Sequence, residues 1–162
     1  MKFNIIDNFI DEKDFLTIKS VLRCRDFPWF IVQNADRKGT PNFMMTHTFY
    51  NFDKPNSDYF DLLTPIRNKL NINSIVREKA NLTFYDDGVP NLYHVDYDHK
   101  GGTTSLFYLD DNGGTFFKIN DKDEYVEAKP NRMVTFDTDT LHKVVRHKSG
   151  DVFRTVLNFN YF

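Results

Sequence analysis

The second half of the chain consists almost entirely of short β-type runs, and this pattern restricts the fold more than any other feature. From Ile75 onward, runs rich in Val, Thr, Phe and Tyr alternate with sequences typical of turns. The turn sequences lie at residues 86–88, 100–102, 112–114, 129–131 and 149–151. They separate about seven or eight short strands, a number typical of a sandwich or a jelly-roll barrel.

Helical patterns are confined to the part of the chain before Ile75. Asp11 can cap a first helix with apolar residues three or four positions apart. Ser57 can cap a second helix, in which Pro65 predicts a kink or a break. Because the helices precede the strands instead of alternating with them, a doubly wound sheet is disfavoured. We therefore expect one mainly β domain with N-terminal helices: residues 1–162, with helical support in 1–74 and a jelly-roll core in 75–162.

Charge and composition argue against several classes of partner. The net charge is −2 and the Lys and Arg residues are dispersed, so we expect neither nucleic-acid binding nor a membrane-surface patch. The one basic cluster, residues 146–148, is expected on a solvated turn. No stretch approaches the roughly 20 apolar residues of a membrane span, and polar residues interrupt the N-terminus before a signal-peptide core.

The cysteine content indicates a reducing compartment. Cys24 is the only cysteine, which rules out an internal disulfide. We therefore expect a cytoplasmic protein. The many Asn, Lys and Phe residues are typical of an AT-rich genome, such as a viral one. Oligomeric state cannot be predicted from this sequence.

The sequence His94-Val95-Asp96, together with the later His142, has the clearest chemical meaning. Residues two apart on a strand project from the same face, so His94 and Asp96 can present an imidazole and a carboxylate to one ion. His142 begins a separate segment and can supply a third ligand. Two imidazoles and one carboxylate can hold Fe(II) by one face, leaving positions for a chelating 2-oxo acid and O2. Zinc would also accept this set, so ligand type alone does not distinguish the two metals.

Arg154 begins the last predicted strand and favours an anionic ligand. A guanidinium inside a barrel needs a carboxylate partner, and it can pair with one through two hydrogen bonds. Tyr85 lies on the strand before the metal motif, and Tyr108 can add a second phenol hydrogen bond to the same ligand. The alternation partners of Tyr85 form an unusually polar face that predicts a cavity wall: Thr83, Asn81 and Arg77.

The region from about residue 75 to 162 carries these residues in a fixed order: His94-Val95-Asp96, Tyr108-Leu109, Gly113-Gly114, Phe136, His142 and Arg154. This set resembles the prolyl-4-hydroxylase-like branch of the Fe(II)/2-oxoglutarate-dependent dioxygenases. The resemblance implies a double-stranded β-helix fold. It also implies iron ligation and catalysis by three residues: His94, Asp96 and His142.

The resemblance further implies how the co-substrate is bound. Arg154 corresponds to the salt-bridge partner of the distal carboxylate of 2-oxoglutarate, and Tyr85 and Tyr108 match tyrosines that contact 2-oxoglutarate in relatives. The implied reaction consumes O2, hydroxylates a C–H bond and releases succinate and CO2. The implied substrate is a prolyl residue of a peptide or protein, or a free amino acid. We expect substrate contacts from Gln33–Met45 and Asp86–Leu92, which read as loops.

Two positions depart from the pattern of relatives. Some relatives place a hydroxyl residue two positions after the arginine, where this chain has Val156. Nucleic-acid-repair members carry a second arginine six positions after the first, where this chain has Asn160. Together with the absence of a basic patch, Asn160 argues against the demethylation of nucleic-acid bases.

Two alternative functions remain open. A cupin-like metalloprotein uses the same ligand types without 2-oxoglutarate, and omitting the 2-oxo acid from an assay distinguishes it. A non-catalytic β-barrel that binds peptides or sugars is the alternative from another class, and its metal site would be vestigial. The intact set of three ligands and an arginine argues against such decay, because drift usually removes at least one ligand.

Alternatives also remain open for single residues. His147 is the alternative third ligand. Arg154 could form a structural ion pair with a protein carboxylate instead of binding a ligand. We expect Trp29 to be a core aromatic residue, and His47 and His99 to be structural.

Overall fold

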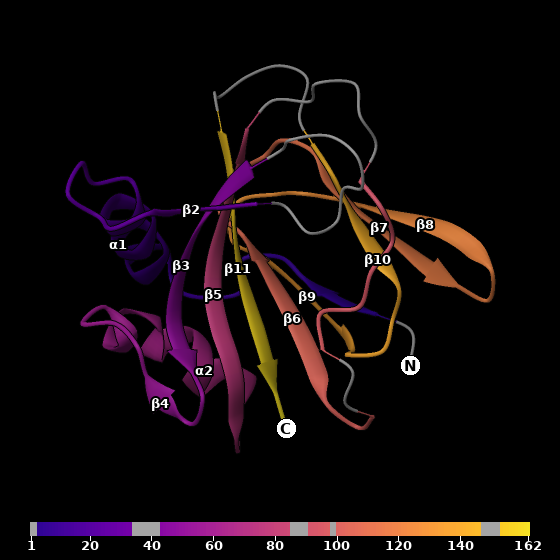
Figure 1. The fold of residues 1–162 in the computed structure, drawn as a ribbon, viewed down its shortest axis with the longest axis horizontal. Helices are drawn as coiled ribbons and strands as arrows, with labels where there is room; N and C mark the ends of the chain where they lie inside the picture. The colour runs from indigo at the N-terminus through magenta and orange to yellow at the C-terminus, as the bar shows by residue number, and fades with distance from the viewer. Residues whose placement is uncertain (1–2, 34–42, 85–90, 98–99, 147–152) are drawn as a thin grey trace.

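The computed structural model describes residues 3–33, 43–84, 91–97, 100–146 and 153–162 (Figure 1). The larger of two antiparallel sheets contains, in spatial order, β1 (Asn4–Ile6), β9 (Arg132–Asp137), β6 (Thr103–Tyr108), β11 (Phe153–Tyr161), β5 (Ile75–Phe84), β3 (Phe43–Asn51) and β2 (Phe30–Gln33), with β4 (Lys54–Pro55) paired to β3. The smaller sheet contains β10 (His142–Val145), β7 (Gly114–Ile119) and β8 (Lys122–Glu127). The helices are α1 (Glu12–Leu22), the 3-10 helix η1 (Phe60–Leu63) and α2 (Thr64–Leu70).

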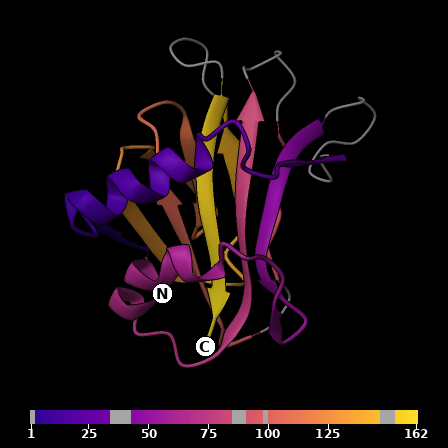
Figure 2. The same ribbon diagram turned by 90° about the vertical axis from the view of Figure 1, so that its left-hand side faces the viewer.

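The helices lie against one face of the larger sheet, and the smaller sheet lies on its other side (Figures 1 and 2). The prediction of a mainly β jelly-roll fold is therefore confirmed. None of the helices in the described ranges is long and apolar enough to cross a membrane.

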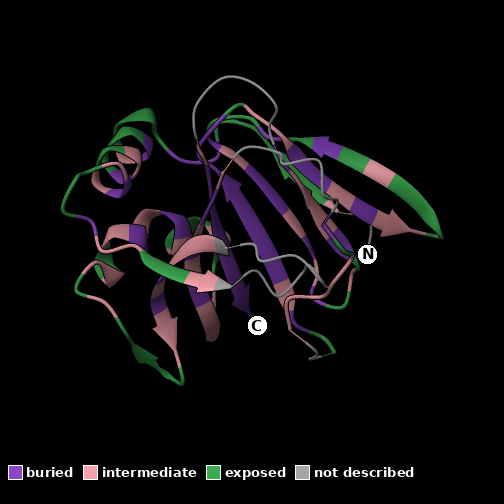
Figure 3. Ribbon diagram, turned by 45° about the horizontal axis from the view of Figure 1, so that its top comes forward, coloured by how far each residue is buried: buried purple, intermediate pink, exposed green. Residues whose placement is uncertain are grey.

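Two apolar clusters fill the spaces on either side of the larger sheet. One joins the helices to the sheet and includes Ile18, Ile66, Phe107 and Leu157, each with at most 1% of its surface exposed. The other lies between the sheets and includes Phe117 and Phe136 with their neighbours. Figure 3 shows this pattern: β6 and β11 are buried along most of their length, whereas the outer side of α1 is exposed. Full burial of each large apolar side chain stabilises the fold by about 1.5–3 kcal/mol.

Helix α1 is fastened to the sheet by charge as well as by apolar packing. Lys19 and Arg23, near its C-terminal end, both pair with Asp110, a carboxylate that is 2% exposed. The other Asp110 oxygen accepts a hydrogen bond from the backbone N–H of Thr155 at 2.8 Å. Cations near a helix C-terminus also interact favourably with the helix dipole. Asp110 therefore links the end of α1 to β11.

The antiparallel register of β5 and β11 determines which side chains meet between the two sheets. Arg154 pairs with Thr83, Val156 with Asn81, and Asn158 with Lys79. Alternate residues of each strand face the same side, so these six side chains belong to one wall. The polar wall expected from the sequence is present on the described part of β5.

The prediction that residues 1–74 are helical support is only partly correct. The break expected at Pro65 is confirmed, because η1 ends at Leu63 and α2 begins at Thr64. However, β1, β2, β3 and β4 also lie in this region, and β3 pairs with β5 on one side and with the edge strand β2 on the other. A nine-residue strand forms there because Phe49 and His47 on one face are buried while their neighbours are only half-buried.

Two local expectations also need correction. The segment Gln33–Met45 is not simply a loop, since its ends belong to β2 and β3; residues 34–42 lie outside the described residues. Arg146, expected on a solvated turn, is only 5% exposed. His47 is structural, as expected: its ring bonds to the backbone O of Pro28 and the hydroxyl of Ser57. His99 and His147 lie outside the described residues.

Candidate metal centre

Two of the three predicted ligands are joined directly through their backbones. His94 and His142 form an isolated antiparallel bridge, in which the N–H of each donates to the C=O of the other at 3.0 and 2.9 Å. His142 is the first residue of β10, as predicted, but His94 and Asp96 do not lie on a regular strand. The expected strand alternation is therefore wrong for this segment. A single bridge holds it beside β10 instead.

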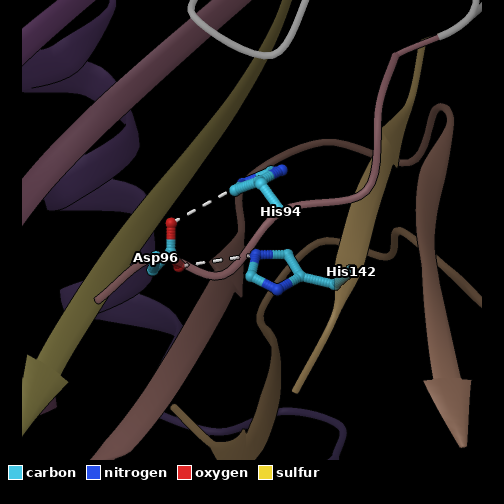
Figure 4. Close-up of side chains that lie close together, drawn as sticks. All are labelled: His94, Asp96 and His142. Atoms are coloured by element: carbon cyan, nitrogen blue, oxygen red, sulfur yellow. Dashed lines mark ion pairs between the residues drawn. The ribbon is translucent and has the colours of Figure 1, made fainter. Parts of the chain in front are cut away.

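The side chains of His94, Asp96 and His142 point toward one another (Figure 4). The Asp96 carboxylate lies 3.8 Å from Nε2 of His94 and 3.5 Å from Nε2 of His142. One ligand atom from each residue lies within 4.8 Å of the others, close enough to share one metal ion. The side chain of His94 is 26% exposed, whereas those of Asp96 and His142 are 6% and 5% exposed. The group is therefore buried on one side and open at His94.

The hydrogen bonds of the imidazoles favour metal binding through Nε2. Nδ1 of His142 lies 3.0 Å from the backbone O of Thr140, and a carbonyl can only accept, so Nδ1 carries the proton. In neutral His142 the lone pair is then on Nε2, facing Asp96. Nδ1 of His94 is directed at the O of Leu92 over a longer 3.5 Å. Two neutral imidazoles and a carboxylate form a donor set that fits Fe(II).

Asp96 is kept ionised by its surroundings. Burial raises the pKa of its carboxyl, but the hydrogen bond and the charge of His142 in its protonated form, the charge of Lys79 and the hydrogen bond from Asn158 together outweigh burial. Its pKa therefore lies far below the ordinary value. Nδ2 of Asn158 donates to Oδ2 of Asp96 at 2.6 Å, and Arg77 donates to the Asp96 backbone O at 3.3 Å. These contacts fix the orientation of a carboxylate ligand from behind, as partners of metal ligands commonly do.

The three residues line a pocket of about 590 Å³, open mouth included, between the two sheets. Its remaining walls are formed by ten side chains: Met44, Lys79, Asn81, Thr83, Leu106, Thr115, Val144, Arg154, Val156 and Asn158. Four of the buried polar atoms in these walls have no hydrogen-bond partner among the described residues: Asn81 Oδ1, Thr83 Oγ1, Arg154 Nε and Asn158 Oδ1. Buried polar groups are almost always paired, so such a group of unsatisfied atoms indicates a polar ligand.

Arg154 lies in the same pocket, four residues before Asn158 on β11. Its Nη2 donates to the O of Gly114 at 3.2 Å, and its guanidinium carbon lies 5.3 Å from the centre of the Tyr108 ring. In the part of the chain that the structure describes, no carboxylate forms an ion pair with it. Burial lowers the pKa of Arg154, and the phenol of Tyr108 partly opposes this. Since a guanidinium stays charged in proteins, this end of the pocket attracts an anion.

The remaining residues that the sequence singled out do not line the pocket or lie outside the described residues. Tyr108 is fully buried behind Arg154 and its hydroxyl bonds to that of Thr115 at 2.7 Å, but it does not line the pocket. Tyr85 lies outside the described residues. Gly114 is not merely part of a turn: it begins β7, and its carbonyl holds Arg154.

Lys79 and Asn158 are among the pocket residues that had no predicted role. Asn158 was placed on the face of Arg154 by strand alternation, but the sequence does not show that it reaches Asp96. Lys79 lies between Arg77 and Asn81 on the same alternating face, so the two-residue period was a signal for it.

The fold is similar to that of several solved structures. A 2-oxoglutarate/Fe(II) oxygenase-family oxidoreductase from Burkholderia pseudomallei aligns with a TM-score of 0.74 and 13% identity, over 98% of this chain and 84% of that one. A prolyl-4-hydroxylase from Pseudomonas putida aligns with a TM-score of 0.62 and 14% identity, over 98% and 91%. A prolyl hydroxylase from Trichoplax adhaerens, in complex with a hypoxia-inducible-factor peptide fragment, aligns with a TM-score of 0.68 and 16% identity, over 99% and 83%.

No protein-family model matches the sequence, and no curated protein sequence matches it. At identities of 13–16% the similarity to solved structures concerns the fold. It extends over nearly the whole chain and is accompanied by a His-Asp-His group that fits an iron site. The chain has the fold of the 2-oxoglutarate- and Fe(II)-dependent oxygenases.

Proposed function

We propose that this protein is a 2-oxoglutarate- and Fe(II)-dependent dioxygenase that hydroxylates a C–H bond and releases succinate and CO2. The observation that carries this proposal is one pocket with a three-ligand metal group and a buried arginine that lacks a carboxylate partner among the described residues. A cupin-like enzyme without 2-oxoglutarate would have no need for such an arginine. A binding module would need neither feature.

His94, Asp96 and His142 are proposed as the iron ligands and the catalytic residues. When bound, Fe(II) supplies the coupling of O2 reduction to the oxidative decarboxylation of 2-oxoglutarate and to hydroxylation of the substrate. The residues of the chain provide binding, orientation and exclusion of water. Asn158 holds the carboxylate of Asp96, and Thr140 orients the ring of His142.

Arg154 is proposed to bind the distal carboxylate of 2-oxoglutarate, and Tyr108 to act with it by holding the guanidinium against its ring. Tyr85 remains proposed as a further contact. We also propose that residues 1–162 form a single domain, because β1, β2 and β3 from the N-terminal region extend the same sheet that the strands after residue 75 form.

For the substrate, we propose a prolyl residue of a peptide or protein, or a free amino acid. Support comes from the Trichoplax adhaerens prolyl hydroxylase, which shares the fold and is in complex with a peptide. The proposed substrate contacts at 33–45 and 86–92 lie largely outside the described residues.

The decisive experiment is anaerobic titration of the purified protein with Fe(II) and then 2-oxoglutarate. We expect the weak visible charge-transfer band of a chelated 2-oxo acid with the wild type and no band with His142→Ala. Folded, iron-loaded wild-type protein that gives no band would rule out the oxygenase proposal and favour the cupin-like alternative.

A further inference from the structure

Thr83 lies in the wall of the pocket that also contains Arg154. Its side chain lines the pocket, the residue is 5% exposed, and its hydroxyl has no hydrogen-bond partner in the part of the chain that the structure describes. It is the direct cross-strand partner of Arg154. We infer that Thr83, together with Arg154, binds the distal carboxylate and supplies from β5 the hydroxyl that Val156 cannot supply from β11. This inference rests on the proposed use of 2-oxoglutarate.

The unsatisfied groups at this end of the pocket match a carboxylate. Arg154 donates from Nη2 to the O of Gly114, and its Nε has no acceptor among the described residues. The Thr83 hydroxyl can also donate. A carboxylate only accepts hydrogen bonds and offers about four lone-pair directions, so it can satisfy both donors at once. Leaving a buried donor unsatisfied costs about 1–3 kcal/mol, which favours a bound anion here.

Other polar side chains of the pocket are less suitable for this role. The hydroxyl of Thr115 is already bonded to Tyr108. The unsatisfied atom of Asn81 is its Oδ1, an acceptor that a carboxylate would repel. Val156, between Arg154 and Asn158 on the same face, has no polar atom. Thr83 therefore remains as the hydroxyl donor beside Arg154.

The position of Thr83 along the strands also fits a chelated dicarboxylate. Asn158 marks the metal end of the pocket because it bonds to Asp96. Arg154 is four residues away on β11, which corresponds to about 13 Å of strand, and the register places Thr83 at the level of Arg154. The metal group and the two donors therefore lie toward opposite ends of one pocket, which is the arrangement that the two ends of a chelated 2-oxo dicarboxylate require.

The test measures ligand binding in the anaerobic Fe(II) protein through the charge-transfer band. The two probes are 2-oxoglutarate and 2-oxobutyrate, which has the same chelating group but no distal carboxylate. Thr83→Val keeps the shape and removes the hydroxyl, and we expect it to raise the Kd of 2-oxoglutarate about tenfold. The Kd of 2-oxobutyrate should stay unchanged, and Thr83→Ser should restore 2-oxoglutarate binding.

Ser105→Ala serves as the control, because it removes a buried hydroxyl of β6 that bonds to Thr135 and does not line the pocket. It should leave both Kd values unchanged. An unchanged Kd of 2-oxoglutarate in Thr83→Val would overturn the inference, as would an equal weakening of both 2-oxo acids. If the wild type binds neither acid, the proposed function fails and the inference fails with it. If the wild type binds both, only the role of Thr83 is in question.

Discussion

Arg154 combines burial with a charge that no carboxylate balances among the described residues. Replacing it by methionine keeps most of the apolar volume and removes the charge. Truncating one partner of a buried charge pair commonly costs about 2–5 kcal/mol, so we expect Arg154→Met to raise the Kd of 2-oxoglutarate about 100-fold. The anaerobic band titration measures this. An unchanged Kd would instead assign Arg154 a purely structural role, as the link between β11 and Gly114.

Asn158 is a positioning residue for the metal ligand Asp96. Its Nδ2 holds the carboxylate at 2.6 Å. Asn158→Leu keeps the approximate size and removes the donor, and loss of such a partner typically weakens metal binding 10–100-fold. We therefore expect Asn158→Leu to raise the Kd of Mn(II) 10–100-fold. The Kd is measured from the electron paramagnetic resonance signal of the unbound ion. A Kd within twofold of the wild type would show that Asn158 only fills the pocket wall.

The sequence predicted those site residues whose role follows from residue type and from nearby positions in the chain. His94, Asp96 and His142 were found from ligand type and order, and the structure brings them together. The predicted strand at His94 was wrong because two residues of alternation cannot distinguish a strand from one isolated bridge. The bond from Asn158 to Asp96 spans 62 positions, so no local pattern encodes it.

At the scale of elements, Gly114 determines how β7 lies against β8. A Cβ on Gly114 would lie 2.4 Å from the O of Val126 and 2.7 Å from the Tyr125 ring, both on β8. Gly114→Ala must therefore displace the start of β7 and with it the carbonyl that holds Arg154. We expect a loss of about 1–3 kcal/mol in the free energy of unfolding, together with weaker 2-oxoglutarate binding.

Gly101→Ala provides the matched control for this prediction. Gly101 has a positive φ of +87°, which strains any residue with a Cβ, but a Cβ there meets nothing within 4 Å. It should cost only backbone strain, about 1–2 kcal/mol, and leave the Kd of 2-oxoglutarate unchanged. Denaturant unfolding and the band titration of both variants test the pair. If Gly114→Ala and Gly101→Ala have the same Kd for 2-oxoglutarate, the position of β7 does not affect co-substrate binding.

The sequence did not reveal the strands of the N-terminal region, which form by pairing with segments far away in the sequence. The strands after Ile75 have turns at their ends, which made them recognisable. β3 has a mixture of polar and apolar residues, and its partner β5 lies 28 to 37 positions away, from the pair Tyr50–Glu78 to the pair Met45–Leu82. Its stability as a strand comes from that pairing and from the burial of Phe49. Local periodicity therefore underestimated how much of the N-terminal region belongs to the sheet.

For the whole molecule, Glu78 couples stability to pH. It is fully buried on β5 and pairs with Arg67 of α2 at 3.0 Å. Burial raises the pKa of Glu78 to about 7, from 4.5, although Arg67 opposes this. A raised pKa means that the folded state binds the proton more tightly. The stability from this group is therefore present below pH 4.5 and is lost as pH rises through 7.

Glu78→Gln should remove this pH dependence while keeping an oxygen for Arg67. We expect the difference in unfolding free energy, wild type minus variant, to fall steadily between pH 5 and pH 8 in denaturant titrations. Burial lowers the pKa of His47, whose contribution has the opposite sign, but it is present in both proteins and cancels in the difference. A difference that does not change with pH would contradict the prediction.

A bound metal would add a connection between the two sheets at the pocket. His142 belongs to the smaller sheet, His94 is attached to it by one bridge, and Asp96 is bonded to Asn158 in the larger sheet. An ion held by all three residues therefore ties the two sheets together across the pocket, and 2-oxoglutarate adds a second tie through Arg154. A ligand that binds only the folded state at 100 times its Kd stabilises that state by about 2.7 kcal/mol.

For a chain of this size that stabilisation corresponds to an increase of roughly 5–10 °C in the thermal midpoint. We expect this increase with saturating Mn(II), and a further one when 2-oxoglutarate is added. Without metal, 2-oxoglutarate should change the thermal midpoint little, because Arg154 then binds only its distal carboxylate and nothing binds the 2-oxo acid group. His142→Ala should abolish the increase from Mn(II), since the remaining two ligands no longer bridge the sheets. An equal increase in wild type and His142→Ala would mean that the metal binds elsewhere, and that the pocket does not hold the two sheets together through His142.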